Sequence, residues 1–402
     1  MSRVLFLTES FHPVLGGGEK HIRALGSALV AAGVPATVVT RRADASWPAE
    51  ETVDGVRVVR VAPPGPGRTG KYRMVPAALR ALWRLRTSFD VLVVRGTRVL
   101  GLPGLVFGRA LGKAVVLQAE INGEMSGQAY TWGTRFERGL VARLVRSAVA
   151  FRNLAMRDAD GFVAMSRAIR DEFAAAGVGP ERIAHIAHGV DTSRYRPAGP
   201  SEKTALRSRF GLQPAAHVVC YTGRLLRGKG LETLVQAFRG LAGRDPRAHL
   251  LLVGSGEGQA LSIEAELRET VAREGLRGRV SFVGRVDAVE DYLRGADVFA
   301  FPSVYEALGI SLIEAAACGL PAVGSCTGGI VDVIEDGESG LLVEPGDAAA
   351  LSAALERLLA DEALRVRMGQ RAVRIAAERF DFASTVVRYR CLFAEVARRV
   401  TH

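Results

Sequence analysis

Residues 217–230 read HVVCYTGRLLRGKG, and this stretch decides the fold. Its first part, His217–Tyr221, is an apolar run of strand length, and its second part, 223–230, is a turn rich in glycine and basic residues. In open α/β sheets, ligands bind at the carboxyl ends of parallel strands, where glycines allow a close backbone approach. The stretch therefore predicts a buried parallel strand that ends in a binding loop.

The same alternation of short apolar runs and longer helical segments extends over the whole chain. In the C-terminal half the further predicted strands are His249–Val253, Val280–Phe282, Val298–Ala300, Pro321–Gly324 and Leu341–Val343. In the N-terminal half they are Val4–Thr8, Ala36–Thr40, Val56–Val61, Val91–Val94, Ala114–Leu117, Gly161–Ala164 and Ile183–Ile186. Apolar runs without alternation suit parallel strands covered on both faces. We therefore predict an α/β fold with a doubly wound parallel sheet in each half.

The chain has 402 residues, which is too long for one ordinary core, so two domains are expected. We predict an N-terminal domain over 1–195, a linker rich in Pro and Gly over 196–213, and a C-terminal domain over 214–380. A final amphipathic helix over 381–402 can pack in either half. The cleft between the domains is the expected ligand site.

The composition is that of a globular protein, with 48% apolar and 24% charged residues. No apolar run reaches the roughly 18 residues that span a bilayer, and the N-terminal apolar stretch is too short for a signal peptide. The four cysteines show no CxxC spacing, so we expect reduced interior residues of a cytoplasmic protein.

The net charge of +11 is confined to one half of the chain. Residues 1–195 hold 27 Lys and Arg against 16 Asp and Glu, whereas the remainder holds 26 of each. This asymmetry indicates an acidic partner for the N-terminal half, such as a phospholipid surface, a phosphorylated acceptor or nucleic acid. Solvated faces of an arginine-rich chain are the alternative.

Two glycine-rich turns are candidate phosphate sites. Gly16, Gly17 and Gly18 follow a strand and open a helix, whose N-terminus favours anions, although a plain connecting turn explains them equally well. In the second turn, Arg224 and Lys229 can clamp a pyrophosphate and stabilise its charge as it leaves. The alternative there is a solvated basic loop.

Two carboxylates eight residues apart, Glu306 and Glu314, form the third candidate. We expect Glu306 in a loop and Glu314 one to two turns into a helix that begins near Gly309. One carboxylate would face sugar hydroxyls and the other a ribose diol, and backbone donors near Gly309 would face phosphates. From spacing alone, two surface glutamates explain the pattern better.

Weaker signals accompany these three. Gly254, in the turn 253–258, could border a nucleotide or merely connect a strand to a helix. His188 and Asp191 could face the cleft or form a turn. Asp158 and Asp160 resemble a metal pair but are better explained as capping groups.

Taken together, these motifs resemble family 4 of the retaining glycosyltransferases. The resemblance covers nearly the whole chain: the N-terminal glycine loop, HGVD at 188–191, GRLLRGKG at 223–230, VGSGEG at 253–258, the pair Glu306 and Glu314, and the stretches 315–334 and 336–347. It implies a GT-B fold, in which two Rossmann-like domains face a central cleft. The C-terminal domain would then bind a nucleotide-diphosphate sugar and the N-terminal domain an acceptor.

The resemblance also implies roles for single residues. Arg224 and Lys229 would hold the donor diphosphate, Glu306 the transferred sugar and Glu314 the ribose. Further donor contacts would come from Gly16, Gly17, Gly254, Arg285, Val286, Leu308, Gly309 and Ile310. The last helix would cross back to the N-terminal domain, and neither a metal nor a cofactor would be needed.

One position departs from the family. Many relatives carry a histidine after the strand Ala114–Leu117, and Glu120 stands there in this chain. We place Glu120 with Glu306, Arg224 and Lys229 in the catalytic set, while His12, His188 and Asp191 remain candidates for the cleft.

The acceptor is expected to be lipid-linked or part of a cell-envelope glycan. Two basic segments with interleaved apolar residues, Arg68–Arg86 and Arg135–Arg157, suit an anionic membrane surface, which would make the enzyme peripheral on the inner face of the plasma membrane. An ordinary surface helix packed on its own sheet is an equal alternative for the second segment. A soluble sugar or natural product remains an alternative acceptor. A non-catalytic sugar-nucleotide-binding protein is the alternative of another class, whereas nucleic acid is disfavoured because no recognition motif is present.

Overall fold

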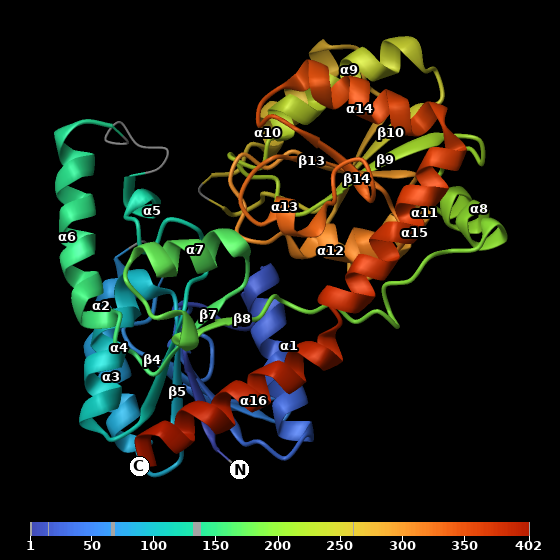
Figure 1. Ribbon diagram of the computed structural model, residues 1–402. Helices are drawn as coiled ribbons and strands as arrows, with labels where there is room; N and C mark the ends of the chain where they lie inside the picture. Colours follow the sequence, from blue (N-terminus) through green and yellow to red (C-terminus); the bar gives the residue numbers. More distant parts are fainter. Residues whose placement is uncertain (1, 15, 66–68, 132–137, 260, 402) are drawn as a thin grey trace. The chain divides into compact units, whose positions relative to one another are not determined.

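The computed structural model describes residues 2–14, 16–65, 69–131, 138–259 and 261–401 (Figure 1). The chain divides into two compact units. Unit 1 comprises residues 1–188 together with 383–402, and unit 2 comprises 189–382. Within the described residues, no helix combines the length and the apolar character that a membrane crossing requires.

Unit 1 is built on an eight-stranded sheet in the order β3-β4-β2-β1-β5-β6-β7-β8. Its strands are β1 (Val4–Leu7), β2 (Ala36–Arg41), β3 (Glu50–Val53), β4 (Val56–Val61), β5 (Val91–Arg95), β6 (Ala114–Gln118), β7 (Gly161–Ala164) and β8 (Ile183–His185). All neighbours pair in parallel except β3, which runs antiparallel to β4. The strand β3 was not predicted, because its residues, EETV, are mostly polar. A turn at Asp54 and Gly55, both with positive φ, joins it to β4.

Helices flank this sheet. They are α1 (Gly17–Ala31), α2 (Gly70–Arg73), α3 (Val75–Arg84), α4 (Leu102–Ala110), α5 (Gln128–Thr131), α6 (Leu140–Met156), α7 (Arg167–Ala175) and α16 (Phe382–Thr401), with a π-turn η1 (Thr97–Gly101) and a 3-10 turn η2 (Pro180–Arg182). The last helix, α16, lies beside the other elements of unit 1 (Figure 1). It buries Tyr389, Phe393 and Val396 in the core of this unit, where Phe393 packs edge-on against Phe6. It therefore belongs to the N-terminal fold, as the resemblance implied.

Unit 2 has a six-stranded, fully parallel sheet in the order β11-β10-β9-β12-β13-β14. Its strands are β9 (His217–Thr222), β10 (Ala248–Val253), β11 (Val280–Gly284), β12 (Val298–Phe301), β13 (Ala322–Ser325) and β14 (Gly340–Val343). Its helices are α8 (Pro200–Arg209), α9 (Leu231–Arg244), α10 (Glu264–Arg273), α11 (Val289–Gly295), α12 (Ile310–Ala317), α13 (Ile330–Val333), α14 (Ala348–Ala360) and α15 (Glu362–Arg379). The prediction of a doubly wound α/β fold in each half is confirmed.

The strand order locates the sites, because the winding direction reverses at one point in each sheet. In unit 2 the reversal lies between β9 and β12, and in unit 1 it lies between β1 and β5. Loops that leave such a switch point diverge and open a crevice for a ligand.

The boundary between the units falls earlier than the sequence suggested. Residues 196–213 were predicted to form a linker, but α8 lies in this segment and is anchored in unit 2. The guanidinium of Arg207 donates to Oδ2 of Asp297 at 2.5 Å and to the carbonyl of Gly295 at 2.9 Å, and Lys203 pairs with Oδ1 of Asp297 at 2.7 Å. This buried ion pair fixes a segment whose Pro and Gly content alone indicated a loose connection.

The first and last residues of unit 2 are joined by hydrogen bonds. The amide of Val190 donates to the carbonyl of Phe380 at 2.8 Å, and the amide of Phe382 donates to the carbonyl of Val190 at 3.1 Å. Unit 2 is therefore a closed insertion whose two ends lie side by side.

The cysteines only partly follow the prediction. Cys220 and Cys318 are buried, and burial raises the pKa of both thiols. Cys326 and Cys391 are exposed, so the expectation that all four are interior residues was wrong for these two.

Candidate active site

Two loops leave the switch point of unit 2 and carry most of the predicted donor residues. The loop 223–230 follows β9, and the loop 302–309 follows the neighbouring strand β12. Both begin where a fully buried strand ends, since Val219, Cys220 and Tyr221 on β9 and Phe299 and Ala300 on β12 are inaccessible. The apolar strands are thus followed by polar loops at the carboxyl end of the sheet.

Lys229 and Glu306 meet across these loops. The Nζ atom of Lys229 lies 2.7 Å from Oε2 of Glu306, and the two side chains retain only 25% and 15% of their exposure. The other oxygen of Glu306 accepts the amide of Ala307 at 3.2 Å. The structure therefore pairs directly two residues that the sequence assigned to the diphosphate and to the sugar.

Two glycines allow this close approach of backbone segments. Gly230 has φ +67°, and a Cβ there would lie 1.9 Å from the carbonyl oxygen of Pro302. Gly254 has φ +133°, and a Cβ there would lie 1.9 Å from the carbonyl oxygen of Gly223. Any other residue would push the loops of the switch point apart.

Two hydroxyl groups that were not predicted as site residues lie at the same carboxyl end of the sheet. Thr222 ends β9 and Ser303 follows β12, with exposures of 3% and 0%. Neither hydroxyl oxygen has a hydrogen-bond partner among the described residues. A buried polar group without a partner is costly, so these hydroxyls suit a ligand that completes them. The signal that could have revealed them is a small polar residue directly after an apolar run.

Arg224 lies on the exposed side of its loop. Its Nη1 atom is 3.5 Å from Oε1 of Gln259, and its carbonyl accepts the hydroxyl of Tyr221 at 3.1 Å. Burial raises the pKa of Tyr221, Glu306 adds to the rise, and Arg224 opposes it. Arg224 and Glu306 therefore both influence the same buried side chain.

The helix α12 begins at the end of the second loop. Gly309, with φ +90°, is its N-cap, Leu308 before it is buried, and Ile310 is its first residue. Glu314 lies in the second turn, and Glu306 lies in the loop. These positions agree with the arrangement expected from the sequence.

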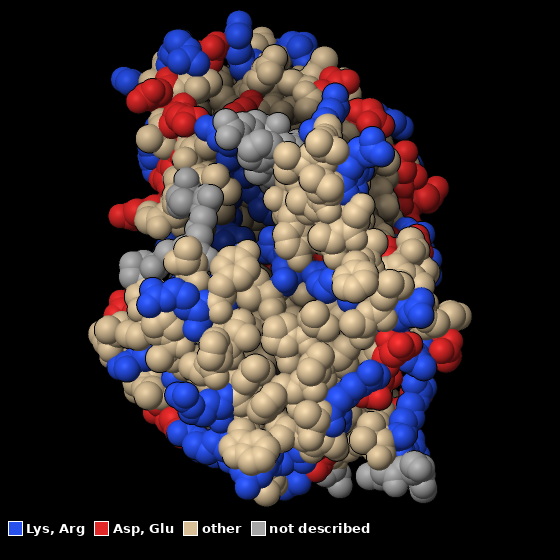
Figure 2. All heavy atoms as spheres, turned by 90° about the vertical axis from the view of Figure 1, so that its left-hand side faces the viewer, with Lys and Arg blue, Asp and Glu red and all other residues tan. Residues whose placement is uncertain are grey.

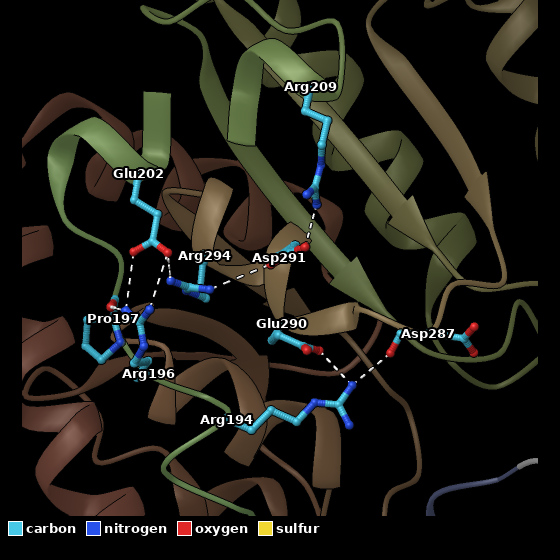
Figure 3. A network of polar contacts seen from close by, with 9 residues as sticks. All are labelled: Arg194, Arg196, Pro197, Glu202, Arg209, Asp287, Glu290, Asp291 and Arg294. Atoms are coloured by element: carbon cyan, nitrogen blue, oxygen red, sulfur yellow. Dashed lines mark hydrogen bonds and ion pairs between the residues drawn. The ribbon is translucent and has the colours of Figure 1, made fainter. Parts of the chain in front are cut away.

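Glu314 is linked to the segment that enters unit 2. After burial itself, the charge of Glu314 and its hydrogen bond raise the pKa of Tyr195. The preceding residue, Arg194, donates to the carbonyl of Asp287 at 2.8 Å and to Oε2 of Glu290 at 2.9 Å (Figure 3). Tyr195 and Arg194 were not recognised from the sequence, because nothing local marks their long-range partners.

Further ion pairs hold this entering segment against α11. Glu202 accepts both Arg196 and Arg294, while Arg209 pairs with Asp291 (Figure 3). Most of these side chains are exposed, so each pair contributes little by itself. Arg294 is the exception, with 9% side-chain exposure. The network ties residues 194–209 to α11, the helix that follows the turn after β11.

That turn contains Arg285 and Val286. Arg285 is exposed, with Nη2 3.5 Å from the carbonyl of Glu257, and Val286 is half-buried. The amide of Gly254 donates to the carbonyl of Gly284 at 2.8 Å, so the loops after β10 and β11 are adjacent. The structure thus brings Gly254 and the turn at 285–286 together.

Unit 1 carries a second group of polar residues at its own switch point. Arg95 ends β5 and is 2% exposed, and its Nη2 atom lies 3.3 Å from Oε1 of Glu120, which follows β6. Desolvation raises the pKa of Glu120 to about 7; Arg95 opposes the rise, and Glu124 adds to it. The side chain still keeps 37% exposure, so this carboxyl remains accessible to solvent.

Glu124, which sequence analysis did not select, orders the backbone around Glu120. Its Oε2 atom accepts the amide and the hydroxyl of Thr97 at 2.6 and 2.7 Å, and its Oε1 atom accepts the amide of Glu120 at 3.1 Å. Burial raises the pKa of Glu124, and its bonds to Thr97 oppose the rise. Glu124 therefore positions Glu120 rather than offering a free carboxylate.

The glycines at the start of α1 lie beside this group. Gly16 is the N-cap of α1 and Gly17 its first residue, and the carbonyl of Gly18 is 3.4 Å from Nη1 of Arg95. A Cβ at Gly16 would lie 2.2 Å from Oε2 of Glu19. The helix N-terminus that the sequence predicted as an anion site therefore has Glu19 in its first turn.

The remaining cleft candidates have local partners. His188 is 3% exposed and stacks on His21 with ring centroids 3.9 Å apart; burial lowers the pKa of His21 to about 3 and that of His188 as well. His12 lies 3.3 Å from Arg23. Asp191 belongs to unit 2, where it accepts the amide and hydroxyl of Ser193 in a turn.

No group of three or more His, Cys, Asp and Glu side chains among the described residues is arranged to hold a metal ion. Asp160 accepts the amide of Val115 at 2.8 Å, and Asp158 lies 3.8 Å from Arg182. Asp160 therefore holds the backbone of strand β6, and Asp158 forms an exposed ion pair; neither of these contacts is a helix cap.

Two family models match the chain, one in each half. The model described as "Glycosyltransferase Family 4" matches residues 15–194, and the model described as "Glycosyl transferases group 1" matches residues 202–374. The second match contains the switch-point loops with Lys229 and Glu306, and the first contains Arg95 and Glu120.

A D-inositol 3-phosphate glycosyltransferase of Rhodococcus opacus is 34% identical over 213 residues, which cover 52% of this chain and 47% of the relative. The chain thus spans about half the length of the curated relatives it matches. Among solved structures, a sucrose-phosphate synthase from Thermosynechococcus elongatus is similar with TM-score 0.81 and 25% identity, covering 98% of this chain and 100% of that one.

The Anabaena protein HepE, solved in complex with UDP-glucose, is similar with TM-score 0.75 and 21% identity, and the likeness covers 100% of both chains. This likeness concerns the fold. Together with the two parallel sheets, it shows that the chain has the GT-B fold. The two family matches, which together cover residues 15–194 and 202–374, show that the chain belongs to the family 4 glycosyltransferases.

Proposed function

We propose that this protein transfers a hexose-type sugar from a nucleotide-diphosphate donor to an acceptor, with retention of the anomeric configuration and without a metal or cofactor. The observation that carries the proposal is the meeting of Lys229 and Glu306 at the switch point of unit 2. At the carboxyl end of the sheet, the cation can stabilise a leaving diphosphate and the carboxylate can accept hydrogen bonds from sugar hydroxyls.

The donor would change the partners of this pair. A diphosphate brings more negative charge than one carboxylate, so it competes with Glu306 for the ammonium group of Lys229. The released carboxylate then accepts hydrogen bonds from the transferred sugar. Arg224 reaches the same diphosphate from the exposed side of its loop, and the hydroxyls of Thr222 and Ser303 offer further donors.

The neighbouring elements suit the rest of the nucleotide. Glu314 is proposed to bind the ribose diol, with Arg285 and Val286 beside the base. Leu308, Gly309 and Ile310 lie at the start of α12, where backbone amides face outward to phosphate oxygens. Gly254 borders the same edge through its bond to Gly284.

In the transfer step, the bond between the anomeric carbon and the diphosphate oxygen breaks as the acceptor oxygen bonds to the same carbon. The leaving phosphate takes the proton of the acceptor hydroxyl, so no separate base is needed. Lys229 and Arg224 stabilise the charge that develops on the diphosphate.

On the side of unit 1, the proposed contributors are Glu120, Gly16 and Gly17. Glu120 would accept a hydrogen bond from the sugar or from the acceptor hydroxyl, in the place where many relatives have a histidine. Its raised pKa, about 7, would make this contact dependent on pH. For Gly16 and Gly17, a contact with donor phosphates rests on the family resemblance.

We propose a phosphorylated or lipid-linked acceptor at the inner face of the plasma membrane, within polysaccharide or glycolipid biosynthesis. The surplus of positive charge in residues 1–195 supports it, as does the inositol phosphate in the name of the Rhodococcus relative. A soluble sugar is the alternative acceptor. A non-catalytic nucleotide-sugar-binding protein is the alternative of another class, and it would bind donors without turnover.

Thermal unfolding with a panel of UDP-, GDP-, ADP- and dTDP-sugars in EDTA tests the donor site. A donor at 100 times its Kd stabilises the fold by about 2.7 kcal/mol. The shift should disappear in Arg224→Ala and Glu314→Ala. It should persist in Arg227→Ala, a matched control on the same loop whose exposed guanidinium pairs with Glu266.

If no donor in the panel shifts the unfolding temperature at millimolar concentration, the proposed donor site is wrong. Binding without transfer of radiolabelled sugar to any membrane-lipid, phosphorylated or soluble acceptor would favour the non-catalytic alternative. NMR of the product tests retention, because an inverted anomeric signal contradicts it.

A further inference from the structure

The helix α6 of unit 1 exposes its apolar residues. Leu140, Leu144, Phe151 and Leu154 are 70%, 61%, 77% and 52% exposed. At 3.6 residues per turn these four side chains fall within an arc of about 80°. They form one stripe along the outer side of the helix, which we call the α6 stripe.

The rest of α6 rules out the ordinary explanation for such residues. The side chains that α6 buries are Ala142, Val149, Asn153 and Met156, centred on the opposite side of the helix. Asn153 anchors this inner side by donating to the carbonyl of Met125 at 2.7 Å. The alternative left open above, that the apolar side packs on its own sheet, is therefore wrong for the α6 stripe, although Arg135 of that segment lies outside the described residues.

Two exposed aromatic residues lie on α2 and α3, helices on the same side of unit 1 as α6 (Figure 1). Tyr72 is 57% and Trp83 55% exposed. Lys71 lies over the ring of Tyr72 and Arg86 over the ring of Trp83, at 5.3 and 4.6 Å from the ring centroids. Aromatic rings paired with cations in this way are typical of the boundary between apolar chains and charged headgroups.

The charge around the stripe has one sign. Residues 69–86 and 138–157 each contain five Lys and Arg and no Asp or Glu. The exposed Arg143 on α6 and Arg157, which directly follows the helix, border one edge of the stripe. Figure 2 looks onto the side of the molecule that bears α6 and α3 and shows a broad area without charge, bordered by many more basic than acidic side chains.

These observations decide which occupant fits. A second copy of the chain would bring arginines against arginines, and an uncharged apolar partner would leave the bordering cations without counter-charge. An anionic membrane surface matches both the apolar stripe and the basic residues beside it, because acyl chains can surround the apolar side chains and headgroup phosphates can pair with the cations.

We propose that the α6 stripe inserts into the headgroup layer of an anionic membrane, with Trp83 and Tyr72 at the same interface. This surface is distinct from the proposed donor site, and binding is measured without donor. Failure of vesicle binding therefore leaves the proposed donor site standing, although it removes support for an acceptor at the membrane, and failure of donor binding leaves the membrane proposal standing.

The test is sedimentation of the full chain with vesicles of phosphatidylcholine, with or without 30% phosphatidylglycerol. The protein should bind the anionic vesicles at low salt and be released by high salt. The exchange Leu144→Ser with Phe151→Ser should weaken binding at least about tenfold, since each side chain loses its transfer into the apolar layer. Arg143→Gln should weaken it about fivefold.

The matched control is Val366→Ser with Val387→Ser, two exposed apolar residues on α15 and α16 at 53% and 54% exposure. This pair should bind like the wild type. As a direct readout of insertion, fluorescence of Phe151→Trp should be quenched by brominated lipids in the anionic vesicles.

The proposal is overturned if the wild type does not bind anionic vesicles at low salt, or if the stripe variant binds them equally well. Equal binding to vesicles with and without phosphatidylglycerol would contradict the role of the arginines. A dimer that the stripe variant dissociates, with no vesicle binding, would assign the surface to a second copy instead.

Discussion

The ammonium group of Lys229 lies 2.7 Å from a carboxylate oxygen of Glu306, and the two residues come from loops at neighbouring strands of one sheet. Each neutralises the other. Under the proposed function, a diphosphate competes with Glu306 for Lys229, so substitutions of the two residues should have different effects.

Lys229→Met should weaken binding of the nucleotide-diphosphate sugar by about 1.5–3 kcal/mol, or roughly 10- to 100-fold in Kd, because a charge-assisted bond to the diphosphate is lost. Isothermal titration calorimetry with the donor identified in the panel measures the change. Arg227→Ala, on the same loop, should bind like the wild type. An unchanged Kd in Lys229→Met would remove this residue from the site.

Glu306→Gln should have the opposite effect on the nucleotide diphosphate alone. Without the competing carboxylate, Lys229 is free for the phosphates, so the diphosphate should bind as tightly as before or more tightly. The preference for the sugar-bearing donor over the bare diphosphate should fall at the same time. Calorimetry measures the affinity for both ligands. An equal loss of affinity for the sugar-bearing donor and for the bare diphosphate would mean that Glu306 does not contact the sugar.

Gly230→Ala should destabilise unit 2 by about 3 kcal/mol or more, because alanine disfavours φ +67° and its Cβ would overlap the carbonyl of Pro302. Gly211→Ala is the control, with φ +72° and open space around the new Cβ, and should cost about 1 kcal/mol. Urea unfolding compares the two. Equal costs would show that the loops can separate without penalty.

Arg207→Ala should destabilise unit 2 by about 3 kcal/mol, because it leaves the buried carboxylate of Asp297 without its guanidinium partner. Arg209→Ala, on the same helix, removes an exposed pair with Asp291 and should cost less than about 1 kcal/mol. Chemical unfolding of both variants checks the difference. If Arg207→Ala behaved like Arg209→Ala, the segment 196–213 would be a loose linker after all.

Glu120 should make the protein less stable as the pH rises from about 4.5 to 7. Its pKa is raised to about 7 in the fold, so the folded state holds a proton that the unfolded chain has already lost. Stability therefore falls across this interval and levels off above it. Glu120→Gln should lack this slope, whereas Glu269→Gln, on the exposed side of α10, should follow the wild type. Unfolding free energies at several pH values give the answer, and identical slopes would contradict the raised pKa.

The fold was predictable because parallel strands leave a strong signal. Strands such as β5 and β9 are apolar on both faces, and each is followed by polar or glycine residues that mark the carboxyl end of the sheet. The strand β3 was not predicted, because it is a mostly polar edge strand that pairs only with β4. The linker was misjudged because Arg207 and Asp297 are 90 positions apart, and no local pattern reveals a buried ion pair of that span.

The candidate site was predictable only in part, for a similar reason. Arg224 and Lys229 stand out as basic residues in a glycine-rich turn, whereas Glu306 and Glu314 were selected through the family resemblance. Tyr195, Ser303 and Glu124 gain their meaning from partners or burial that only the fold supplies. The exposure of Phe151 likewise could not be read from periodicity, since an amphipathic pattern does not tell which side of a helix faces the protein.

The position of α16 has a consequence for how the chain is made. The ribosome delivers residues 189–382 as one continuous stretch, so unit 2 has all its parts before α16 is made. Unit 1 begins first but waits for α16, since Tyr389, Phe393 and Val396 fill its core. Domains can fold as they emerge during synthesis. The second unit in the sequence should therefore mature first, and a nascent chain stopped before residue 382 should expose the apolar sheet face of unit 1 to chaperones.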